Sequence, residues 1–348
     1  MRYVYSDIIQ FRGSHYDFGY MQGELLKNSP ILENRKKQWS ANKRNFHVDE
    51  KIVVDTMKRF SPAIMEEING LADSLAMNTK QALIEFGGYY LEYGRSGCST
   101  FSGENFLIRN YDNDPITYEG RYVAYQPTDG GYATIGPTMQ ITGRTDGLNE
   151  KGLALGYNFV HRKKSDDGFV CNMIGRIVLE NCANTKEAID LLQEVPHRHS
   201  FNYILLDHSG ESTVVECSPR KVTSRKSNAC TNHFEVLTDE NRYRMDDSIK
   251  RMESMQKQES DITDGYKAFR MMNDINGEVF STKYGAWAGT IHTTGYFPKE
   301  LKAWLSLGGD RPPYIVNFNE WLQGKNLHAT KVKGELYSHS IFVNMERL

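Results

Sequence analysis

The sequence predicts an α+β fold, a sandwich of sheets with helices outside, preceded by a helical N-terminal segment. Apolar residues in the first third of the chain recur at helical spacing, whereas from Cys98 onward short alternating runs are separated by turn residues, as in antiparallel strands. Further helices interrupt these strands, which favours the α+β class. A length of 348 residues would allow about two domains. Because we find no internal repeat, low-complexity tract or long linker, we expect one domain, residues 98–348, with residues 1–97 packed on it.

The N-terminal segment is expected to be helical after one opening strand. The strand covers residues 2–11 and breaks at residues 12–14, where Gly13 stands. Asn78, with Gln81 three residues later, is a capping box that predicts a helix over residues 82–93. An earlier helix is indicated by an apolar stripe with a period of 3.6 residues, formed by Ile64, Ile68, Leu71, Leu75 and Ala76.

The remainder of the chain reads as strands with three helices between them. Turn residues precede or join the apolar runs at residues 106–108, 153–159, 203–206 and 213–215. Asn184 and Glu187 form a second capping signal. The predicted helices cover residues 188–193, 242–255 and 264–272. Residues 290–294 are expected to form an internal strand.

Composition excludes several classes of function. The chain has 42 Lys and Arg against 44 Asp and Glu, a net charge of −2, so it lacks the basic surplus that nucleic acids require. Its basic clusters, residues 161–164 and 220–226, are interpreted as solvated hairpin ends. The sequence has no run of about 18 apolar residues, and charges in the first twenty residues argue against a signal peptide. We therefore expect a cytoplasmic protein without membrane contact, whose five cysteines are reduced.

The boundary between the two regions carries the most chemical information. The helical segment ends in Ser96-Gly97, and a strand begins with Cys98-Ser99-Thr100. Cleavage between Gly97 and Cys98 would give the cysteine a free α-amine, whose pKa of about 7.7 to 8.0 allows it to act as a base at neutral pH. A thiol beside its own base is a nucleophile. The alternative is that Cys98 is a small buried hydrophobic residue.

A hairpin after Cys98 would bring an arginine to the thiol. If Gly103-Glu104 forms a two-residue turn, Cys98 lies opposite Arg109, and directly opposed residues share one face of a sheet. The guanidinium would then favour the thiolate. Asp112 would point to the other face unless the chain bends at the turn signal that follows it. The alternative for Arg109 and Asp112 is a surface ion pair at the end of a strand.

Several motifs in order resemble the penicillin acyltransferase branch of the N-terminal-nucleophile hydrolases and, more distantly, the choloylglycine hydrolases. Cys98-Ser99-Thr100 and Arg109-Asn110-Tyr111-Asp112 resemble their nucleophile and Arg-Asn-x-Asp signature. Residues 146–153 with 156–159 are similar to the second motif, and Thr231-Asn232 to the third. Residues 13–23 are similar to the opening of acyltransferase precursors. The resemblance spans about residues 10–305.

The resemblance implies a four-layer αββα sandwich, with residues 1–97 as a pro-segment and residues 98–348 as the catalytic domain. It further implies self-cleavage between Gly97 and Cys98, with Cys98 as nucleophile and its α-amine as base. Arg109 and Asp112 would hold the thiolate and the amine. Asn158 and Asn232 would donate to the oxyanion, a role worth about 3 kcal/mol per donor.

The implied substrate is a small-molecule linear amide, whose acyl group passes through a Cys98 thioester to water or to another amine. No metal or organic cofactor is implied. Choloylglycine hydrolases carry a further active-site arginine late in the chain, where this sequence has residues 289–294, so the resemblance argues against a bile salt. The acyl group, the amine and any homo-oligomer stay open.

Other interpretations remain. A papain-like cysteine peptidase could pair Cys98 with His233, which lies 135 residues later (233 − 98), although papain-type cysteines begin a helix. An uncleaved, non-catalytic binding protein of the same fold is the second alternative. His197 and His199 lack acidic or thiol neighbours, which disfavours a metal site. The glycine pairs 130–131 and 308–309 lack the residues of a phosphate loop.

Overall fold

The computed structural model describes residues 2–41, 48–92, 96–160, 164–241, 245–285, 288–339 and 343–344. Three sequence predictions fall partly outside this range: the end of the helix at 82–93, the basic cluster at 161–164 and the start of the helix at 242–255. The described part of the N-terminal segment holds one strand and five helices: β1 (Arg2–Gly13), α1 (His15–Lys27), α2 (Ile31–Ala41), α3 (Glu50–Phe60), α4 (Pro62–Leu75) and α5 (Thr79–Phe86).

Helix boundaries in this segment follow local capping chemistry. Asn78 accepts a hydrogen bond from the Gln81 backbone, and Gln81 returns one, so the predicted capping box is confirmed. The predicted helix end at residue 93 is wrong, because α5 ends at Phe86. The glycine that follows its C-cap, Gly88, has a φ of +61°, a left-handed conformation that glycine adopts readily and that stops a helix.

The remaining elements form two sheets and their covering helices. The strands are β2 (Ser99–Gly103), β3 (Phe106–Asn113), β4 (Arg121–Pro127), β5 (Thr134–Met139), β6 (Gly143–Arg144), β7 (Asp146–Asn149), β8 (Ala154–Phe159), β9 (Phe201–Leu206), β10 (Thr213–Cys217), β11 (Val222–Lys226), β12 (Ala229–Cys230), β13 (Gly289–Phe297), β14 (Lys302–Leu307), β15 (Tyr314–Asn317) and β16 (Lys331–Leu336). The helices are α6 (Cys171–Asn181), α7 (Thr185–Glu194), α8 (Asp246–Gln258), α9 (Gly265–Asn273) and α10 (Phe318–Leu322).

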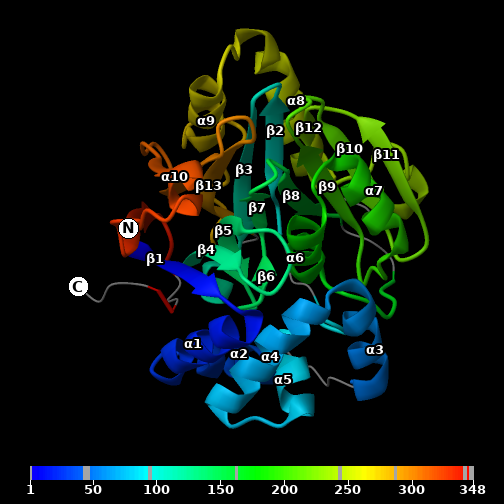
Figure 1. The fold of residues 1–348 in the computed structure, drawn as a ribbon. Helices are drawn as coiled ribbons and strands as arrows, with labels where there is room; N and C mark the ends of the chain where they lie inside the picture. Colours follow the sequence, from blue (N-terminus) through cyan, green and yellow to red (C-terminus); the bar gives the residue numbers. More distant parts are fainter. Residues whose placement is uncertain are drawn as a thin grey trace.

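The larger sheet has the order β11-β10-β9-β8-β7-β5-β4-β1-β16, with β6 paired to β5, and the smaller has the order β12-β2-β3-β13-β14-β15. One apolar core lies between the sheets and contains Cys98, Ile204 and Leu305. A second core joins the larger sheet to α6, α7 and the N-terminal helices, and a third joins the smaller sheet to α8 and α9. The predicted four-layer αββα sandwich is therefore confirmed (Figure 1).

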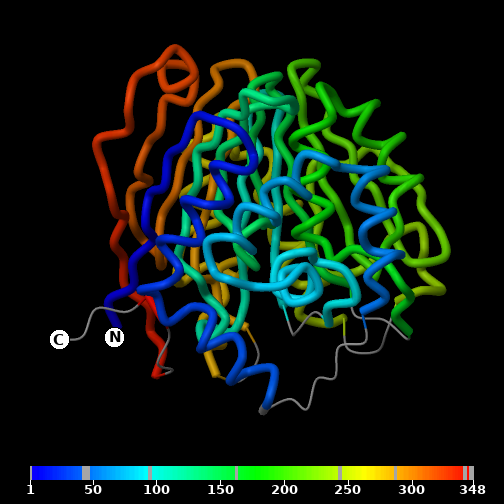
Figure 2. The backbone as a smooth tube through the Cα atoms, turned by 60° about the horizontal axis from the view of Figure 1, so that its bottom comes forward, coloured from blue at the N-terminus to red at the C-terminus, as the bar shows by residue number. Residues whose placement is uncertain are grey.

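The N-terminal segment is built into this sandwich. Its strand β1 pairs in parallel with β4 and antiparallel with β16, so it lies inside the larger sheet and next to the C-terminal strand (Figure 2). Helices α1 and α4 cross closely at two glycines: a Cβ on Gly19 would lie 1.9 Å from the Glu67 carbonyl oxygen, and one on Gly70 would lie 2.1 Å from that of Tyr16. Any side chain at either glycine would separate the helices.

The predicted later helices are present as α7, α8 and α9, and Asn184 caps α7 as expected. All five cysteines are free. Among the described residues, no helix combines the length and apolar character needed to cross a membrane.

Candidate active site

Cys98 lies between the two sheets at the point where the chain enters β2. The residue is completely buried. The preceding stretch runs beside β3, since Ser96 bridges Asn113 and the Gly97 amide donates to the Asp112 carbonyl at 3.3 Å. The hydroxyl of Ser96 lies 3.3 Å from the Cys98 sulfur. The Gly97–Cys98 peptide is thus held against β3 at the junction of the two regions.

Arg109 contacts the Cys98 thiol as predicted, although the predicted register is wrong. Arg109 pairs with Thr100, and the turn falls at residues 104–105, because Gly103 pairs with Phe106. The pairing differs from the prediction by two residues, and a shift of two keeps a side chain on the same face. Nη2 of Arg109 therefore still reaches the Cys98 sulfur, at 3.2 Å.

A second set of contacts fixes the guanidinium of Arg109. Its Nη1 lies 2.9 Å from a carboxylate oxygen of Asp146, and its Nε and Nη2 donate to the Tyr157 carbonyl. Burial opposes ionisation of Asp146, but Arg109, His292 and Thr145 outweigh it and hold the pKa of this carboxyl well below its usual range. Burial raises the pKa of the Cys98 thiol, while Arg109 acts in the opposite direction. Cys98 is thus a buried thiol that faces an anchored cation.

Asp112 meets the thiol through its backbone. Its carbonyl oxygen accepts from the Ser96 hydroxyl at 2.9 Å and lies 3.8 Å from the Cys98 sulfur. Its carboxyl accepts from the Thr290 hydroxyl at 2.6 Å, and burial raises its pKa to about 7 despite the nearby Arg251 cation. Since β3 continues to Asn113, the bend that would have turned Asp112 toward the thiol does not occur. Its proposed contact with the α-amine is a prediction for the cleaved chain.

Asn158 and Asn232 are both buried near the start of β2. Nδ2 of Asn158 donates to the Cys230 carbonyl at 2.8 Å, and its Oδ1 accepts from the Thr100 hydroxyl at 3.2 Å. Nδ2 of Asn232 donates to the Phe159 carbonyl at 2.7 Å. These contacts fix the orientation of both amides. Nδ2 of Asn158 also donates to the Cys230 sulfur at 2.9 Å, which uses its second hydrogen, whereas Nδ2 of Asn232 has one described acceptor for its two hydrogens.

Arg251 of α8 is a site residue that the sequence analysis missed. Its Nη1 donates to the Cys98 carbonyl at 2.8 Å and to the Ser99 hydroxyl at 2.5 Å, and its Nη2 donates to Asn232 Oδ1 at 2.8 Å. It is 4% exposed. The sequence did contain a sign that Arg251 is buried: it lies on the apolar stripe of an amphipathic helix, together with Met252 and Met255. An arginine therefore reaches the site, although residues 289–294 supply none.

The histidines singled out in the sequence have other partners. Nδ1 of His233 lies 2.8 Å from the Ser248 hydroxyl and 3.2 Å from that of Thr231. His197 bonds to the Leu192 carbonyl, and burial lowers its pKa to about 4. His199 bonds to the Leu91 carbonyl and lies 3.7 Å from a carboxylate oxygen of Glu92, so the expectation that it lacks an acidic neighbour is wrong. In the part of the chain that the structure describes, no group of three or more His, Cys, Asp or Glu residues could hold a metal ion.

A family model described as "Acyl-coenzyme A:6-aminopenicillanic acid acyl-transferase" matches residues 99–312. Similar solved structures include a mutant conjugated bile acid hydrolase from Clostridium perfringens, with 14% identity and a TM-score of 0.45 over 72% of this chain and 100% of that one. Penicillin V acylase from Agrobacterium tumefaciens has 16% identity and a TM-score of 0.44, over 72% and 97%.

The N-acylethanolamine-hydrolyzing acid amidase orthologue of Caenorhabditis elegans has 14% identity and a TM-score of 0.38, over 58% of this chain and 92% of that one. No curated protein sequence matches the chain significantly.

Proposed function

Since the chain belongs to the acyl-coenzyme A:6-aminopenicillanic acid acyl-transferase family, it is an enzyme that hydrolyses or transfers the acyl group of linear amides, and we propose that it acts through Cys98. In this proposal the chain first cleaves itself between Gly97 and Cys98. The substrate is a small N-acylated molecule, and the reaction takes place in the cytoplasm.

One observation carries the proposal: Nη2 of Arg109 lies 3.2 Å from the Cys98 sulfur inside a fully buried site. A buried thiol ordinarily stays protonated, because burial disfavours its charged form. An anchored cation at hydrogen-bond distance stabilises the thiolate that nucleophilic attack requires. A purely structural cysteine has no need of such a neighbour.

Self-cleavage requires only groups of the chain and one water molecule. The Cys98 thiol attacks the Gly97 carbonyl carbon, a sulfur–carbon bond forms, and the peptide carbon–nitrogen bond breaks. The thiol proton passes to the departing nitrogen, which becomes the α-amine of Cys98. Water then hydrolyses the thioester, leaving a Gly97 carboxylate and regenerating the thiol. The cleaved chain carries a nucleophile and a base on the same residue.

Turnover repeats this chemistry on an external amide. The α-amine takes the thiol proton, and the thiolate attacks the substrate carbonyl. The second Nδ2 hydrogen of Asn232 donates to the resulting oxyanion, and Asn158 donates the hydrogen that it releases from the Cys230 sulfur. When the intermediate collapses, the substrate amine leaves with the proton, and a thioester remains on Cys98. Water releases the acyl group as an acid, whereas a second amine receives it as a new amide. The thiol, the amine and the amide donors all belong to the chain, so the proposed reaction needs no cofactor.

Intact-mass measurement tests the proposal. The matured protein is expected to consist of residues 1–97 and residues 98–348, with Cys98 as a new amino terminus. Cys98→Ala is expected to stay a single 39.9 kDa chain without activity, because alanine cannot attack. A wild-type chain that remains at 39.9 kDa after prolonged incubation would overturn self-cleavage.

A papain-like mechanism is the second candidate, and the geometry disfavours it. Cys98 leads into strand β2, whereas a papain-type cysteine begins a helix. Nδ1 of His233 bonds to the hydroxyls of Ser248 and Thr231, whereas a papain-like mechanism needs the imidazole to bond to the thiol.

A further inference from the structure

We infer that a row of buried polar side chains on the larger sheet, formed by Asn158, Asn202 and Glu216, positions the loop that carries Asn232. Within this row Asn202 and Glu216 are positioning residues for the oxyanion donor. The catalytic consequence of this inference rests on the proposed function. The contacts between the row and the loop are independent of that function.

The pairing of three neighbouring strands creates the row. Asn158 of β8 pairs with Asn202 of β9, and Asn202 pairs with Glu216 of β10. Directly paired residues share one face of a sheet. This face points toward the smaller sheet, because residues two positions away, Ile204 and Val214, lie in the core between the sheets. All three polar residues of the row are completely buried.

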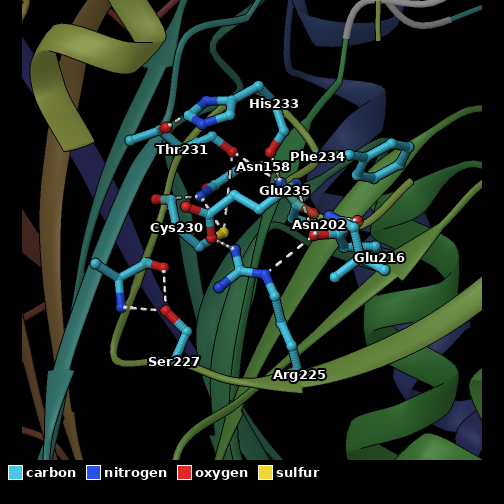
Figure 3. A network of polar contacts seen from close by, with 12 residues as sticks. Asn158, Asn202, Glu216, Arg225, Ser227, Cys230, Thr231, His233, Phe234 and Glu235 are labelled. Carbon is cyan, nitrogen blue, oxygen red and sulfur yellow. Dashed lines mark hydrogen bonds and ion pairs between the residues drawn. The ribbon is translucent and has the colours of Figure 1, made fainter. Parts of the chain in front are cut away.

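The three side chains of the row bind successive backbone groups from Cys230, the last residue of β12, onward (Figure 3). Asn158 donates to the Cys230 carbonyl at 2.8 Å, and Asn202 donates to the carbonyls of Thr231 and His233 at 3.1 and 2.8 Å. Glu216 accepts from the next amides, those of residues 235, 236 and 237, at 2.8 to 3.1 Å. Asn232 lies within the stretch that these three side chains hold.

These contacts replace the hydrogen bonds of secondary structure. Residues 231–237 belong to no helix or strand, yet residues 231–234 and 237 are buried, where an unpaired backbone group is costly, while Glu235 and Val236 are exposed. A carboxylate only accepts hydrogen bonds and offers about four acceptor positions, so it suits three consecutive amide donors. The Arg225 side chain, at 3.0 Å from Glu216 Oε1, compensates the buried charge.

The consequence concerns the amide of Asn232. Its position depends on the loop backbone, and a displacement of about 1 Å at a catalytic group can cost on the order of 10²-fold in rate. Loosening the loop should therefore lower kcat. The substrate should still bind to the rest of the site, so KM should stay largely unchanged.

The test compares Glu216→Gln with Glu240→Gln in the matured enzyme. Glutamine has the shape of glutamate, but its amide group donates where the backbone amides need an acceptor. Glu240 is a matched control, since it is also buried and paired to an arginine, Arg220, while its side chain makes no described contact with residues 231–237. Glu216→Gln is expected to speed amide hydrogen exchange at residues 235–237 by at least about tenfold and to lower kcat by about 10- to 100-fold at unchanged KM.

Glu216→Asp, which keeps the carboxylate, should restore part of the protection and part of kcat. Unchanged exchange in Glu216→Gln overturns the inference whether or not the wild-type enzyme is active. Faster exchange with unchanged kcat overturns the positioning role and leaves the proposed function intact. A wild-type chain without self-cleavage or amidase activity contradicts the proposed function and the catalytic part of the inference, while the exchange result still decides whether the row holds the loop.

Discussion

Two buried arginines show how similar surroundings can serve different ends. Arg176 of α6 lies where the N-terminal helices meet the larger sheet, 2.7 Å from Glu67 and 2.5 Å from Glu180. Arg109 lies between the two sheets, 2.9 Å from Asp146 and 3.2 Å from the Cys98 sulfur. Both are completely buried.

The difference lies in what the guanidinium faces. Arg176 joins a carboxylate of the N-terminal segment to one of its own helix, and His15 adds a contact to Glu180 at 3.4 Å. Such a closed network of opposite charges stabilises an interface. Arg109 is anchored by one carboxylate and directs another nitrogen at a group that can lose a proton. A buried arginine therefore points to a candidate reactive site when, as at Arg109, one of its contacts is a thiol rather than a carboxylate.

The largest effect is expected at the interface arginine. Arg176→Met leaves Glu67 and Glu180 buried without their cation, and breaking a buried pair from one side costs about 3–5 kcal/mol in the free energy of unfolding. Urea unfolding measures the change. The control, Arg59→Met, removes an exposed pair with Glu194 and should cost less than about 1 kcal/mol. Equal changes in the two variants would show that the interface network is not stabilising.

The stability of the region around Cys98 should depend on pH through Asp112. Burial raises its folded pKa to about 7, above the unfolded value near 3.8. A raised pKa contributes stability that is present below the unfolded value and is lost as pH rises to the folded one. The contribution of Asp112 to the free energy of unfolding should therefore fall, by on the order of a few kcal/mol, between pH 4 and pH 7. Asp112→Asn should flatten this part of the curve, and an unaltered slope would contradict the assignment.

The oxyanion assignment predicts a catalytic loss without loss of fold. Asn232→Ala in the matured enzyme removes one amide donor and should lower kcat by on the order of 10²-fold. Steady-state kinetics on any accepted amide gives kcat, and a thermal unfolding curve verifies the fold. If the substituted enzyme is folded and equally fast, Asn232 is only a loop residue.

The smallest effect is expected at His233. In the proposed mechanism the α-amine of Cys98 is the base, so His233→Ala should retain most of kcat/KM. A papain-like enzyme would lose on the order of 10³-fold or more.

A second variant tests the α-amine itself. It carries one extra alanine before Cys98 that cannot be removed, which converts the amine into a non-basic amide and should abolish turnover. A collapse with His233→Ala, together with indifference to the blocked amine, would replace the proposed mechanism with the papain-like one.

Local patterns in the sequence determined several helix starts and the place of Cys98 at the entry to β2. Capping residues predicted the starts of α5 and α7, and the change from helical to alternating periodicity marked the boundary at Cys98. The face of Arg109 was also predictable, since alternation in a strand has a period of two and survives a register error of two residues. These features depend on residues near one another in the chain.

Tertiary structure decided which distant segments meet. Strand β1 pairs with β16 across more than 300 positions and with β4 across 114 (121 − 7), and no local pattern specifies such pairings. The contact of Arg251 with the Cys98 carbonyl spans 153 positions, and the row of Asn158, Asn202 and Glu216 depends on the register of three strands. Pairing and packing of this kind are selected by the fit of whole surfaces, so only the folded chain shows them.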